Sequence, residues 1–333
     1  MKHVLLIGTG GTITASTIGR LWKPGSLTED FLLKLLPLKD IKIKTKSLFR
    51  IDSSDMQPEF WIDIAKTIYA EIEKNKYNGV VITHGTDTMS YTASALSFLL
   101  QDLNVPIVLT GAQLPLSEPG SDVKRNLLGA IKVAAETDIG EVVIVFNGNI
   151  LRGCRSRKVK ETGFDAFQSI NSPVIGRVLE TVKITSNYRK ISNKKPKLYT
   201  ELEKNVALLK LYPGFSPDIF HRIIDMGYKG FVVEGFGACN VPVNYNSLIS
   251  CIQRAKNENI PVVISTQCVD GYDWTHLYEN GQKALQAGGI PAYDMLSETA
   301  LVKLMWVLKQ TDDMEEIKKL MKKNIAGEIS DGI

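Results

Sequence analysis

The chain has 333 residues, of which 44% are hydrophobic and 23% charged, so it can bury a sizeable core and form two domains. Its formal net charge of +4 is too small to indicate a polyanionic partner, and nucleic-acid binding is not expected. No apolar stretch approaches the roughly 18 to 20 residues that span a bilayer, and the N-terminus does not read as a signal peptide. These features predict a cytoplasmic protein with no membrane partner.

The four cysteines are far apart in the chain, at Cys154, Cys239, Cys251 and Cys268. Their spacing suits neither a disulfide framework nor a metal site built on CxxC pairs. We therefore expect reduced and mostly buried thiols.

Short β-branched runs alternate with helical patterns in the first part of the chain. The expected strands are 4–7, 79–83, 105–110 and 141–146, and the expected helices are 58–74, 88–102 and 121–136. This alternation predicts an α/β fold, with a larger N-terminal domain over residues 1–185 whose mainly parallel sheet is flanked by helices. Residues 42–46 alternate lysine with Ile and Thr, which indicates an edge or one-sided strand.

A polar and basic stretch, residues 186–205, predicts the linker between two domains. A second alternating set follows, with expected strands at 206–211, 231–234 and 262–265 and expected helices at 217–226, 246–258, 297–309 and 313–323. The sequence therefore predicts a smaller C-terminal α/β domain over residues 206–333.

Two of the expected strands end in turns that carry threonine. Strand 4–7 continues into Gly8-Thr9-Gly10-Gly11-Thr12, and strand 79–83 continues into His84-Gly85-Thr86-Asp87. Because ligands bind beyond the carboxyl ends of parallel strands, we expect both turns to face one crevice. The first turn lacks the third glycine of GxGxxG and any Gly-Lys-Ser/Thr, which argues against a nucleotide site. Glycine pairs also expose backbone N–H groups for an oxyanion, although a plain tight turn fits equally well.

Each of the remaining polar segments has a structural alternative. Thr86-Asp87 offers an acceptor for an ammonium group or a cap for the following helix. Asp52-Ser53-Ser54-Asp55 can contact a small zwitterion or form an N-capping cluster. The basic run 155–160 is typical of solvated surface, and a structural role fits His84 better than a general base.

The motifs together resemble the bacterial-type L-asparaginases, closest to the cytoplasmic type I and archaeal members. The resemblance rests on Gly8-Thr9-Gly10-Gly11-Thr12-Ile13, Asp52-Ser53-Ser54-Asp55-Met56, His84-Gly85-Thr86-Asp87-Thr88-Met89 and Gly163-Phe164-Asp165-Ala166-Phe167. It continues through Thr266-Gln267-Cys268 and Asp294-Met295-Leu296-Ser297-Glu298, and so covers nearly the whole chain.

The resemblance implies hydrolysis of the side-chain amide of L-asparagine to L-aspartate and ammonia, with possible activity on glutamine as a minor reaction. It implies that Thr12 is the nucleophile and that Thr86, Asp87 and Lys158 form a second catalytic cluster. It places Asp52, Ser53 and Ser54 around the α-carboxylate and α-amino groups of the substrate. It also implies a homodimer or homotetramer, and a reaction that needs no metal or organic cofactor.

We hypothesise that Lys158 acts through Thr86 to help move protons, since a threonine hydroxyl is a weak nucleophile at neutral pH. Asp87 would anchor the substrate ammonium group. Backbone N–H groups near Gly11 and Thr86 would stabilise the tetrahedral oxyanion.

The chain departs from the family pattern at Trp22, because many members carry a tyrosine in the loop at this position. An indole N–H donates a hydrogen bond but cannot accept a proton. Tyr278 is our candidate substitute, as in relatives that use a tyrosine of the C-terminal domain. The alternative is that Tyr278 packs on its helix and Trp22 only covers the site.

Two other functions remain alternatives. The first is the asparaginase-like subunit of the archaeal glutamyl-tRNA(Gln) amidotransferase, which carries an extra domain before its glycine-threonine motif, whereas here that motif begins eight residues from the start. The second is a non-catalytic amino-acid-binding protein, although binding alone does not require a nucleophile. The preference for asparagine over glutamine, and a regulatory asparagine site, stay open.

Overall fold

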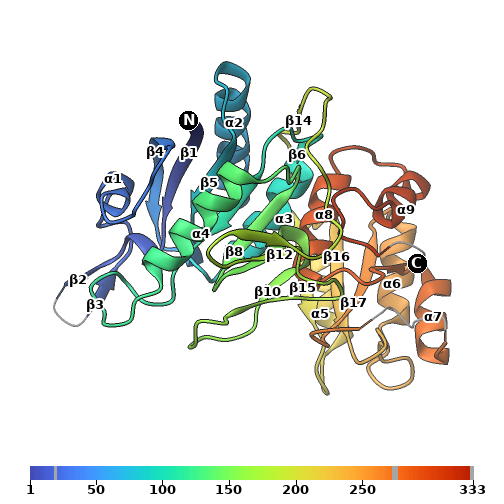
Figure 1. The fold of residues 1–333 in the computed structure, drawn as a ribbon. Coiled ribbons are helices and arrows are strands. Elements are labelled where there is room, and N and C mark those ends of the chain that lie inside the picture. Colours follow the sequence, from blue (N-terminus) through green and yellow to red (C-terminus); the bar gives the residue numbers. More distant parts are fainter. Residues whose placement is uncertain (19–20, 272–276, 331–333) are drawn as a thin grey trace. The chain divides into compact units, whose positions relative to one another are not determined.

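The computed structural model describes residues 1–18, 21–271 and 277–330 (Figure 1). The chain divides into two compact units, Met1–Thr200 and Glu201–Ile333. Both units are built from alternating strands and helices, and the first is the larger. The predicted fold class is therefore confirmed.

The first unit contains an eight-stranded sheet in the order β13-β12-β9-β8-β7-β5-β1-β4. Its parallel part comprises β4 (Ile41–Ile51), β1 (Lys2–Gly10), β5 (Gly79–Thr83), β7 (Ile107–Thr110) and β8 (Val142–Phe146). An antiparallel extension follows with β9 (Asn149–Arg152), β12 (Gly176–Val178) and β13 (Val182–Ile184). β4 lies at the edge, as its alternating lysines predicted.

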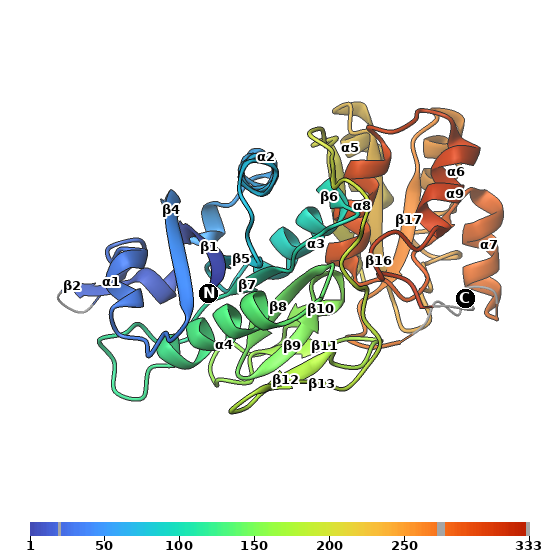
Figure 2. The ribbon, with the colours of Figure 1, turned by 45° about the horizontal axis from the view of Figure 1, so that its top comes forward.

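Helices cover both faces of this sheet (Figure 2). α4 (Val123–Glu136) packs on one face, where its apolar residues join Val4, Leu6 and Val81 in one core cluster. α2 (Pro58–Lys74) and α3 (Met89–Leu99) lie on the opposite face. α2 begins at Pro58 and buries Trp61 on its inner side, a residue type whose burial typically contributes a few kcal/mol. A short helix, α1 (Glu29–Leu33), was not predicted.

Several short strand pairs complete the first unit. β2 (Ser16–Ile18) pairs with β3 (Leu21–Lys23), and β10 (Ser156–Lys158) pairs with β11 (Phe167–Ser169). β14 (Lys197–Leu198) pairs with β6 (Leu100–Gln101), so part of the segment expected as a linker is bonded to the first unit. Strands of two or three residues carry too little periodicity to be found from the sequence.

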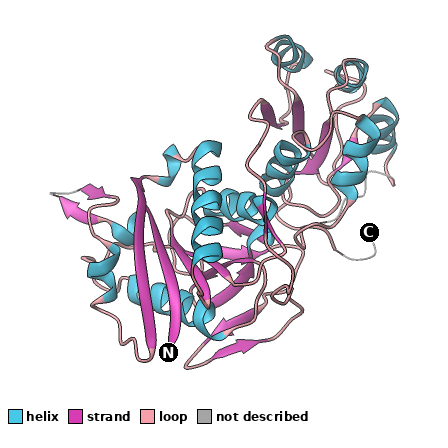
Figure 3. Ribbon diagram, turned by 90° about the horizontal axis from the view of Figure 1, so that it is seen from above, coloured by secondary structure: helices cyan, strands magenta, loops and turns pink. Residues whose placement is uncertain are grey.

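The second unit has a four-stranded parallel sheet with helices around it (Figure 3). Its strands are β15 (Val206–Lys210), β16 (Gly230–Gly235), β17 (Val262–Thr266) and β18 (Ile290–Pro291). Its helices are α5 (Pro217–Asp225), α6 (Ile249–Asn257), α7 (Glu279–Ala287), α8 (Ser297–Val307) and α9 (Met314–Lys322). Of these elements, β18 and α7 were not predicted.

Three of the cysteines, Cys154, Cys239 and Cys251, are buried thiols, while Cys268 is an exposed thiol. This agrees with the expected reduced and mostly buried thiols. Over the described ranges, no helix combines the length and the apolar character that crossing a lipid bilayer requires.

Candidate active site

The two threonine-bearing turns are in direct backbone contact. Gly11 has φ 78°, and a Cβ added to it would lie 2.3 Å from the Gly85 nitrogen and 2.4 Å from the Gly85 Cα. Only glycine fits both the backbone conformation and this close approach. The turn after β1 therefore packs directly against the turn after β5. This contact brings Thr12 and Thr86 to the same end of the sheet.

Among the threonines of the first turn, Thr12 has the uncommitted hydroxyl. The buried Thr9 hydroxyl donates to Thr83 O at 2.8 Å, and the Thr14 hydroxyl donates to Gly11 O at 3.1 Å. Thr12 opens a 3-10 helix and is half-buried, and no described residue forms a hydrogen bond with its hydroxyl. Its oxygen is free to meet a ligand.

Ser53 is the member of the Asp52-Ser53-Ser54 segment that reaches the turns. A Cβ on Gly85 would lie 2.5 Å from Ser53 Oγ, and the Thr88 hydroxyl donates to Ser53 O at 2.7 Å. Asp52 and Ser54 are exposed, and Asp52 Oδ1 accepts from the backbone N–H and the hydroxyl of Ser54, both at 2.9 Å. The segment therefore also caps its own 3-10 helix, whereas α2 begins with no side-chain cap.

Lys158 joins the second turn, although it belongs to a basic run typical of surface. Its Nζ donates to Thr86 Oγ1 at 2.7 Å and to Asp87 Oδ1 at 2.6 Å. Thr86 is 7% exposed, while the Asp87 side chain is 61% exposed. Because an ammonium group only donates, the Thr86 hydroxyl accepts from Lys158 and keeps its own proton to donate elsewhere.

The helix-cap alternative for Thr86 and Asp87 is wrong. The N-cap residue of α3 is Thr88, and its side chain accepts no capping hydrogen bond. The polar groups of Thr86 and Asp87 are therefore directed to Lys158 rather than to the helix.

Several contacts restrain the loop that follows Lys158. Gln113 Nε2 donates to Glu161 O at 2.7 Å and to Gly163 O at 3.2 Å. Lys160 forms an ion pair with Asp165, and the Arg125 guanidinium lies 5.2 Å from the centre of the Phe164 ring. The Gln113 and Arg125 contacts come from outside the loop, and the Lys160 ion pair lies within it. Together they restrict the position of β10, whose last residue is Lys158.

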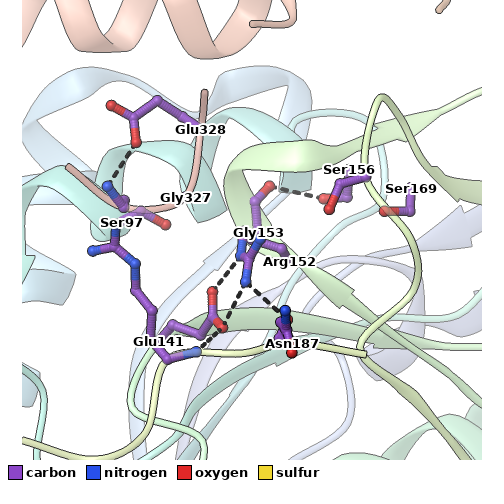
Figure 4. A network of polar contacts seen from close by, with 12 residues as sticks. Ser97, Glu141, Arg152, Gly153, Ser156, Ser169, Asn187, Gly327 and Glu328 are labelled. Atoms are coloured by element: carbon purple, nitrogen blue, oxygen red, sulfur yellow. Dashed lines mark hydrogen bonds and ion pairs between the residues drawn. The ribbon is translucent and has the colours of Figure 1, made fainter. Parts of the chain in front are cut away.

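A partly buried ion pair restrains the chain before Lys158 (Figure 4). Arg152 Nε donates to Glu141 Oε2 at 2.6 Å, and its Nη2 donates to Asn187 O at 3.3 Å. Glu141 also accepts from the Arg189 N–H at 2.8 Å, while the Ser156 hydroxyl donates to Gly153 O. The approach to β10 is thereby anchored to the sheet.

Residues after β7 hold a third turn beside the first two. The His84 N–H donates to Thr110 O at 2.9 Å, and Asn126 Nδ2 donates to the next carbonyl, Gly111 O, at 2.9 Å. The buried Asp122 carboxylate accepts from Asn126 and from the Gln113 N–H. The sequence analysis did not identify Asn126 or Asp122, because both lie in an otherwise ordinary helix start.

His84 is fully buried, and burial lowers its pKa to about 4, so the imidazole is neutral at pH 7. Its Nδ1 lies 2.7 Å from Gly85 O, and its Nε2 lies 2.9 Å from Thr92 Oγ1. The Trp61 indole N–H donates to the same Thr92 oxygen at 3.0 Å. The expected structural role of His84 fits this geometry, whereas Trp61 and Thr92 gave no signal in the sequence beyond their helical periodicity.

Trp22 and Tyr278 lie in different units. Trp22 is 45% exposed on the β2–β3 hairpin, and its Nε1 donates to Glu118 Oε1 at 3.3 Å. Tyr278 is the N-cap residue of α7 in the second unit and is 54% exposed. Its neighbour in the sequence motif, His276, lies outside the described residues.

In the described ranges, no group of three or more His, Cys, Asp or Glu side chains is arranged to hold a metal ion. The polar groups that the structure gathers are instead hydroxyls, a carboxylate and an ammonium group, at Thr12, Ser53, Thr86, Asp87 and Lys158. This is a set suited to an amino-acid ligand and to acyl transfer.

Comparison with known proteins gives consistent results along the chain. The family model described as "Asparaginase, N-terminal" matches residues 3–192, and the one described as "Glutaminase/Asparaginase C-terminal domain" matches residues 205–321. An L-asparaginase of Thermococcus kodakarensis is 40% identical over 98% of this chain and 99% of its own length. A subunit of the glutamyl-tRNA(Gln) amidotransferase of Pyrococcus horikoshii is 42% identical over 99% of this chain and 77% of its own length.

Solved structures agree. The thermostable L-asparaginase from T. kodakarensis superposes with a TM-score of 0.91 at 39% identity, over 98% of this chain and 99% of that one. L-asparaginase I from Vibrio cholerae gives a TM-score of 0.87 at 33% identity, over 99% of both chains. A probable cytoplasmic L-asparaginase from Campylobacter jejuni gives 0.85 at 28% identity, over 97% of this chain and 100% of that one. The chain belongs to the asparaginase family.

Proposed function

We propose that the protein is an L-asparaginase, which hydrolyses the side-chain amide of L-asparagine to L-aspartate and ammonia. The observation that carries the proposal is the contact of Lys158 with Thr86 and Asp87, beside a turn that presents the free hydroxyl of Thr12. A nucleophile, a proton-handling pair and an anchor for an ammonium group are the parts that this reaction needs.

Substrate binding is assigned to the polar groups around the two turns. Asp87 Oδ1 accepts a hydrogen bond from Lys158. The Asp87 carboxylate is largely exposed, and its second oxygen would bind the α-ammonium group of the substrate. Ser53, with Asp52 and Ser54, would contact the α-carboxylate and α-amino groups. Ser53 supports this assignment best, because it is the one that packs on Gly85.

The proposed chemistry has two halves. Thr12 Oγ attacks the amide carbon, its proton passes to the leaving nitrogen, and the C–N bond breaks to release ammonia and a β-acyl ester on Thr12. Water then attacks the ester, which yields aspartate and restores the Thr12 hydroxyl. Thr86, bonded to Lys158, would hold and pass protons, and backbone N–H groups near Gly11 and Thr86 would stabilise the oxyanion, worth about 3 to 4 kcal/mol per donor.

Tyr278 is our candidate for the tyrosine that the family places beside the nucleophile, because Trp22 cannot accept a proton. In a Tyr278→Phe variant, we expect kcat for asparagine to fall by at least about tenfold with a small change in KM. An unchanged kcat would remove Tyr278 from the mechanism.

The second candidate function is that of an ammonia-supplying subunit of a tRNA-dependent amidotransferase. It is favoured by the amidotransferase relative at 42% identity, slightly above the 40% of the named L-asparaginase. Both candidates would use the same threonine chemistry. They differ in whether the purified chain releases ammonia alone.

One assay separates the candidates. The purified protein is incubated with L-asparagine, and ammonia is measured alone and then with an amidotransferase partner and charged tRNA. Release by the chain alone supports the proposal, while release only with partner and tRNA supports the second candidate. Binding of asparagine without release supports a non-catalytic binding protein and overturns the proposal.

The role of Thr12 is tested in the same assay. We expect Thr12→Val to lose at least about a thousandfold in kcat, since the covalent step is abolished. Thr137→Val is the control, because the Thr137 hydroxyl bonds only locally to Val133 O at the end of α4. Ammonia release by Thr12→Val at the parent rate would exclude Thr12 as the nucleophile.

Location and assembly complete the proposal. A cytoplasmic location is supported by the name of the Campylobacter jejuni relative, and a homodimer or homotetramer by the family resemblance. Light scattering of the purified protein tests the assembly, for which a monomeric mass would be the contradicting result. Kinetics with asparagine and glutamine would test the predicted minor glutaminase activity.

A further inference from the structure

A buried polar chain runs behind the Thr86 turn and ends on its backbone. It connects Trp61 of α2, Thr92 of α3 and His84, and it reaches Gly85 O. Its three contacts are 3.0, 2.9 and 2.7 Å long. His84 and Thr92 are 0% exposed and Trp61 is 6% exposed, so water does not compete for these bonds.

The chemistry of the partners fixes the direction of every bond in this chain. Gly85 O can only accept, so His84 carries its proton on Nδ1 and donates it. In a neutral imidazole Nε2 is then an acceptor, and the Thr92 hydroxyl must donate to it. The Trp61 indole can only donate, and it binds the Thr92 oxygen. A single arrangement of protons satisfies all of the groups.

The carbonyl at the end of the chain belongs to the peptide group that also contains the Thr86 N–H. A peptide group is planar, so fixing the direction of Gly85 O fixes the direction of this N–H. Among the described residues the Thr86 N–H has no acceptor, which leaves it available to a bound ligand. Gly85 is also held closely between Gly11 and Ser53, so the peptide has little room to move.

We propose that His84 is a positioning residue, which aims the Thr86 N–H at the oxygen of the reacting amide by holding the Gly85–Thr86 peptide through Nδ1–H. Thr92 donates to Nε2 and so holds the ring with Nδ1–H directed at Gly85 O. This inference rests on the proposed amidohydrolase function and extends it to three residues that do not touch the substrate.

The opposite tautomer shows why the position of this proton matters. With the proton on Nε2, the lone pair of Nδ1 would face the Gly85 carbonyl oxygen at 2.7 Å, and two acceptors would repel each other. The peptide would then turn away and misdirect the Thr86 N–H. Loss of one donor at an oxyanion typically lowers kcat by about 100- to 1,000-fold, and misdirecting a donor costs part of that factor.

The test uses Thr92→Val and Thr92→Ser, of which only Ser keeps the hydroxyl. We expect kcat for asparagine to fall about tenfold or more in Thr92→Val and to stay within about threefold of the parent in Thr92→Ser, with KM within about twofold in both. Ser97→Ala is the control, because it removes a buried hydroxyl of the same helix that bonds Ala93 O and not His84. A parent kcat in Thr92→Val would overturn the inference.

The tautomer itself is read by nitrogen NMR of histidine-labelled protein, in which the sequence has only 4 histidines. The parent should show His84 neutral and protonated on Nδ1 at pH 7, and in Thr92→Val the signal of Nε2 should shift because this nitrogen loses its hydroxyl donor. A parent Nε2–H form or a charged ring at pH 7 would overturn the inference. If Thr92→Val does not fold, Trp61→Phe replaces it, with a smaller fall in kcat and a smaller shift of the Nε2 signal. If the parent releases no ammonia from asparagine, the proposed function fails; if it does and Thr92→Val matches it, only this inference fails.

Discussion

Each unit contains a lysine held by acidic and neutral acceptors, and the two are built differently. Lys303 in α8 is fully buried with Glu328, and its Nζ donates to Glu328 Oε1 at 2.6 Å and to the carbonyls of Met321 and Lys323. Lys158 in β10 is 19% exposed, and its partner Asp87 is 61% exposed. The three protons of Lys303 are used within the protein, whereas the Lys158 cluster keeps carboxylate surface open to solvent.

This difference separates a structural ion pair from one that can take part in chemistry. Glu328 also accepts from the N–H groups of Ile325 and Ala326, so the pair ties the C-terminal segment to α8. A closed arrangement of this kind leaves no acceptor for a substrate. The Lys158 cluster has an open side, and a ligand ammonium group can replace solvent there.

The largest expected effect that tests the comparison is on activity at Lys158. In Lys158→Met we expect kcat for asparagine to fall by about a hundredfold or more, since the Thr86 hydroxyl loses its proton-handling partner. The free energy of unfolding should change by less than about 1 kcal/mol, because the Asp87 side chain is 61% exposed and solvent screens its ion pair with Lys158. Steady-state kinetics and urea unfolding measure the two quantities, and a large loss of stability with normal kcat would reverse the assignment.

The corresponding change at Lys303 should affect stability instead. Lys303→Met leaves Glu328 as a buried unpaired carboxylate, which typically costs about 3 to 5 kcal/mol. The kcat of the protein that remains folded should equal that of the parent. The control is the double variant Lys303→Met with Glu328→Gln, which removes the unpaired charge and should recover part of the lost stability. If no stability is recovered, the buried charge of Glu328 is not the cause of the loss.

A change of pH should have a smaller effect on the free energy of unfolding. The pH range of this effect distinguishes a buried group of the first unit, His84, from one of the second, Glu328. Burial lowers the pKa of His84 to about 4, below its ordinary value of 6.5, so the unfolded chain binds a proton that the folded site excludes. Stability is therefore lost as pH falls from about 6.5 toward 4, and between pH 7 and pH 5 the loss from this group is about 2 kcal/mol.

Glu328 acts in a different pH range. Burial raises its pKa, but the charge and hydrogen bond of Lys303 outweigh burial and hold the pKa below the ordinary 4.5, so its contribution is lost only below about pH 4.5. Urea unfolding at pH 7 and pH 5 compares the parent with His84→Phe, whose dependence on pH should be weaker. An equal dependence in both proteins would show that His84 is not the titrating group.

The sequence predicted most of the fold because the long elements are strongly patterned. The helix at 58–74 and the strand at 79–83 have the predicted bounds, since a proline start and a β-branched run mark them. α7 was missed, and its mixed sequence from Glu279 to Ala287 carries a weak apolar stripe. The short strands β9, β12 and β13 were missed because pairing with neighbours, rather than local periodicity, decides such strands.

The site was predictable in part. The glycine-threonine turns are visible in the local sequence, but the seating of Gly11 on Gly85 depends on the register of β1 against β5. Lys158 looked like one charge among several, and only the resemblance to a family singled it out. Thr92 and Trp61 could not have been found, because a hydrogen-bonded threonine and a buried tryptophan leave no trace in the sequence of two helices.

The smallest expected effect is at Trp22, where the hairpin meets the loop 115–121. Trp22 and Glu118 share one hydrogen bond of 3.3 Å between partly exposed side chains, and such a bond contributes about 1 kcal/mol or less. Trp22→Phe keeps an aromatic ring and removes the N–H, so we expect KM for asparagine to change by less than about fivefold and kcat to stay near the parent value. Glu118→Gln is the matched variant, because it keeps an acceptor for the indole and should change even less. A kcat in Trp22→Phe that falls as far as in Lys158→Met would place the indole in the chemistry itself. The contrast between the closed Lys303 pair and the open Lys158 cluster would then have to include the hairpin.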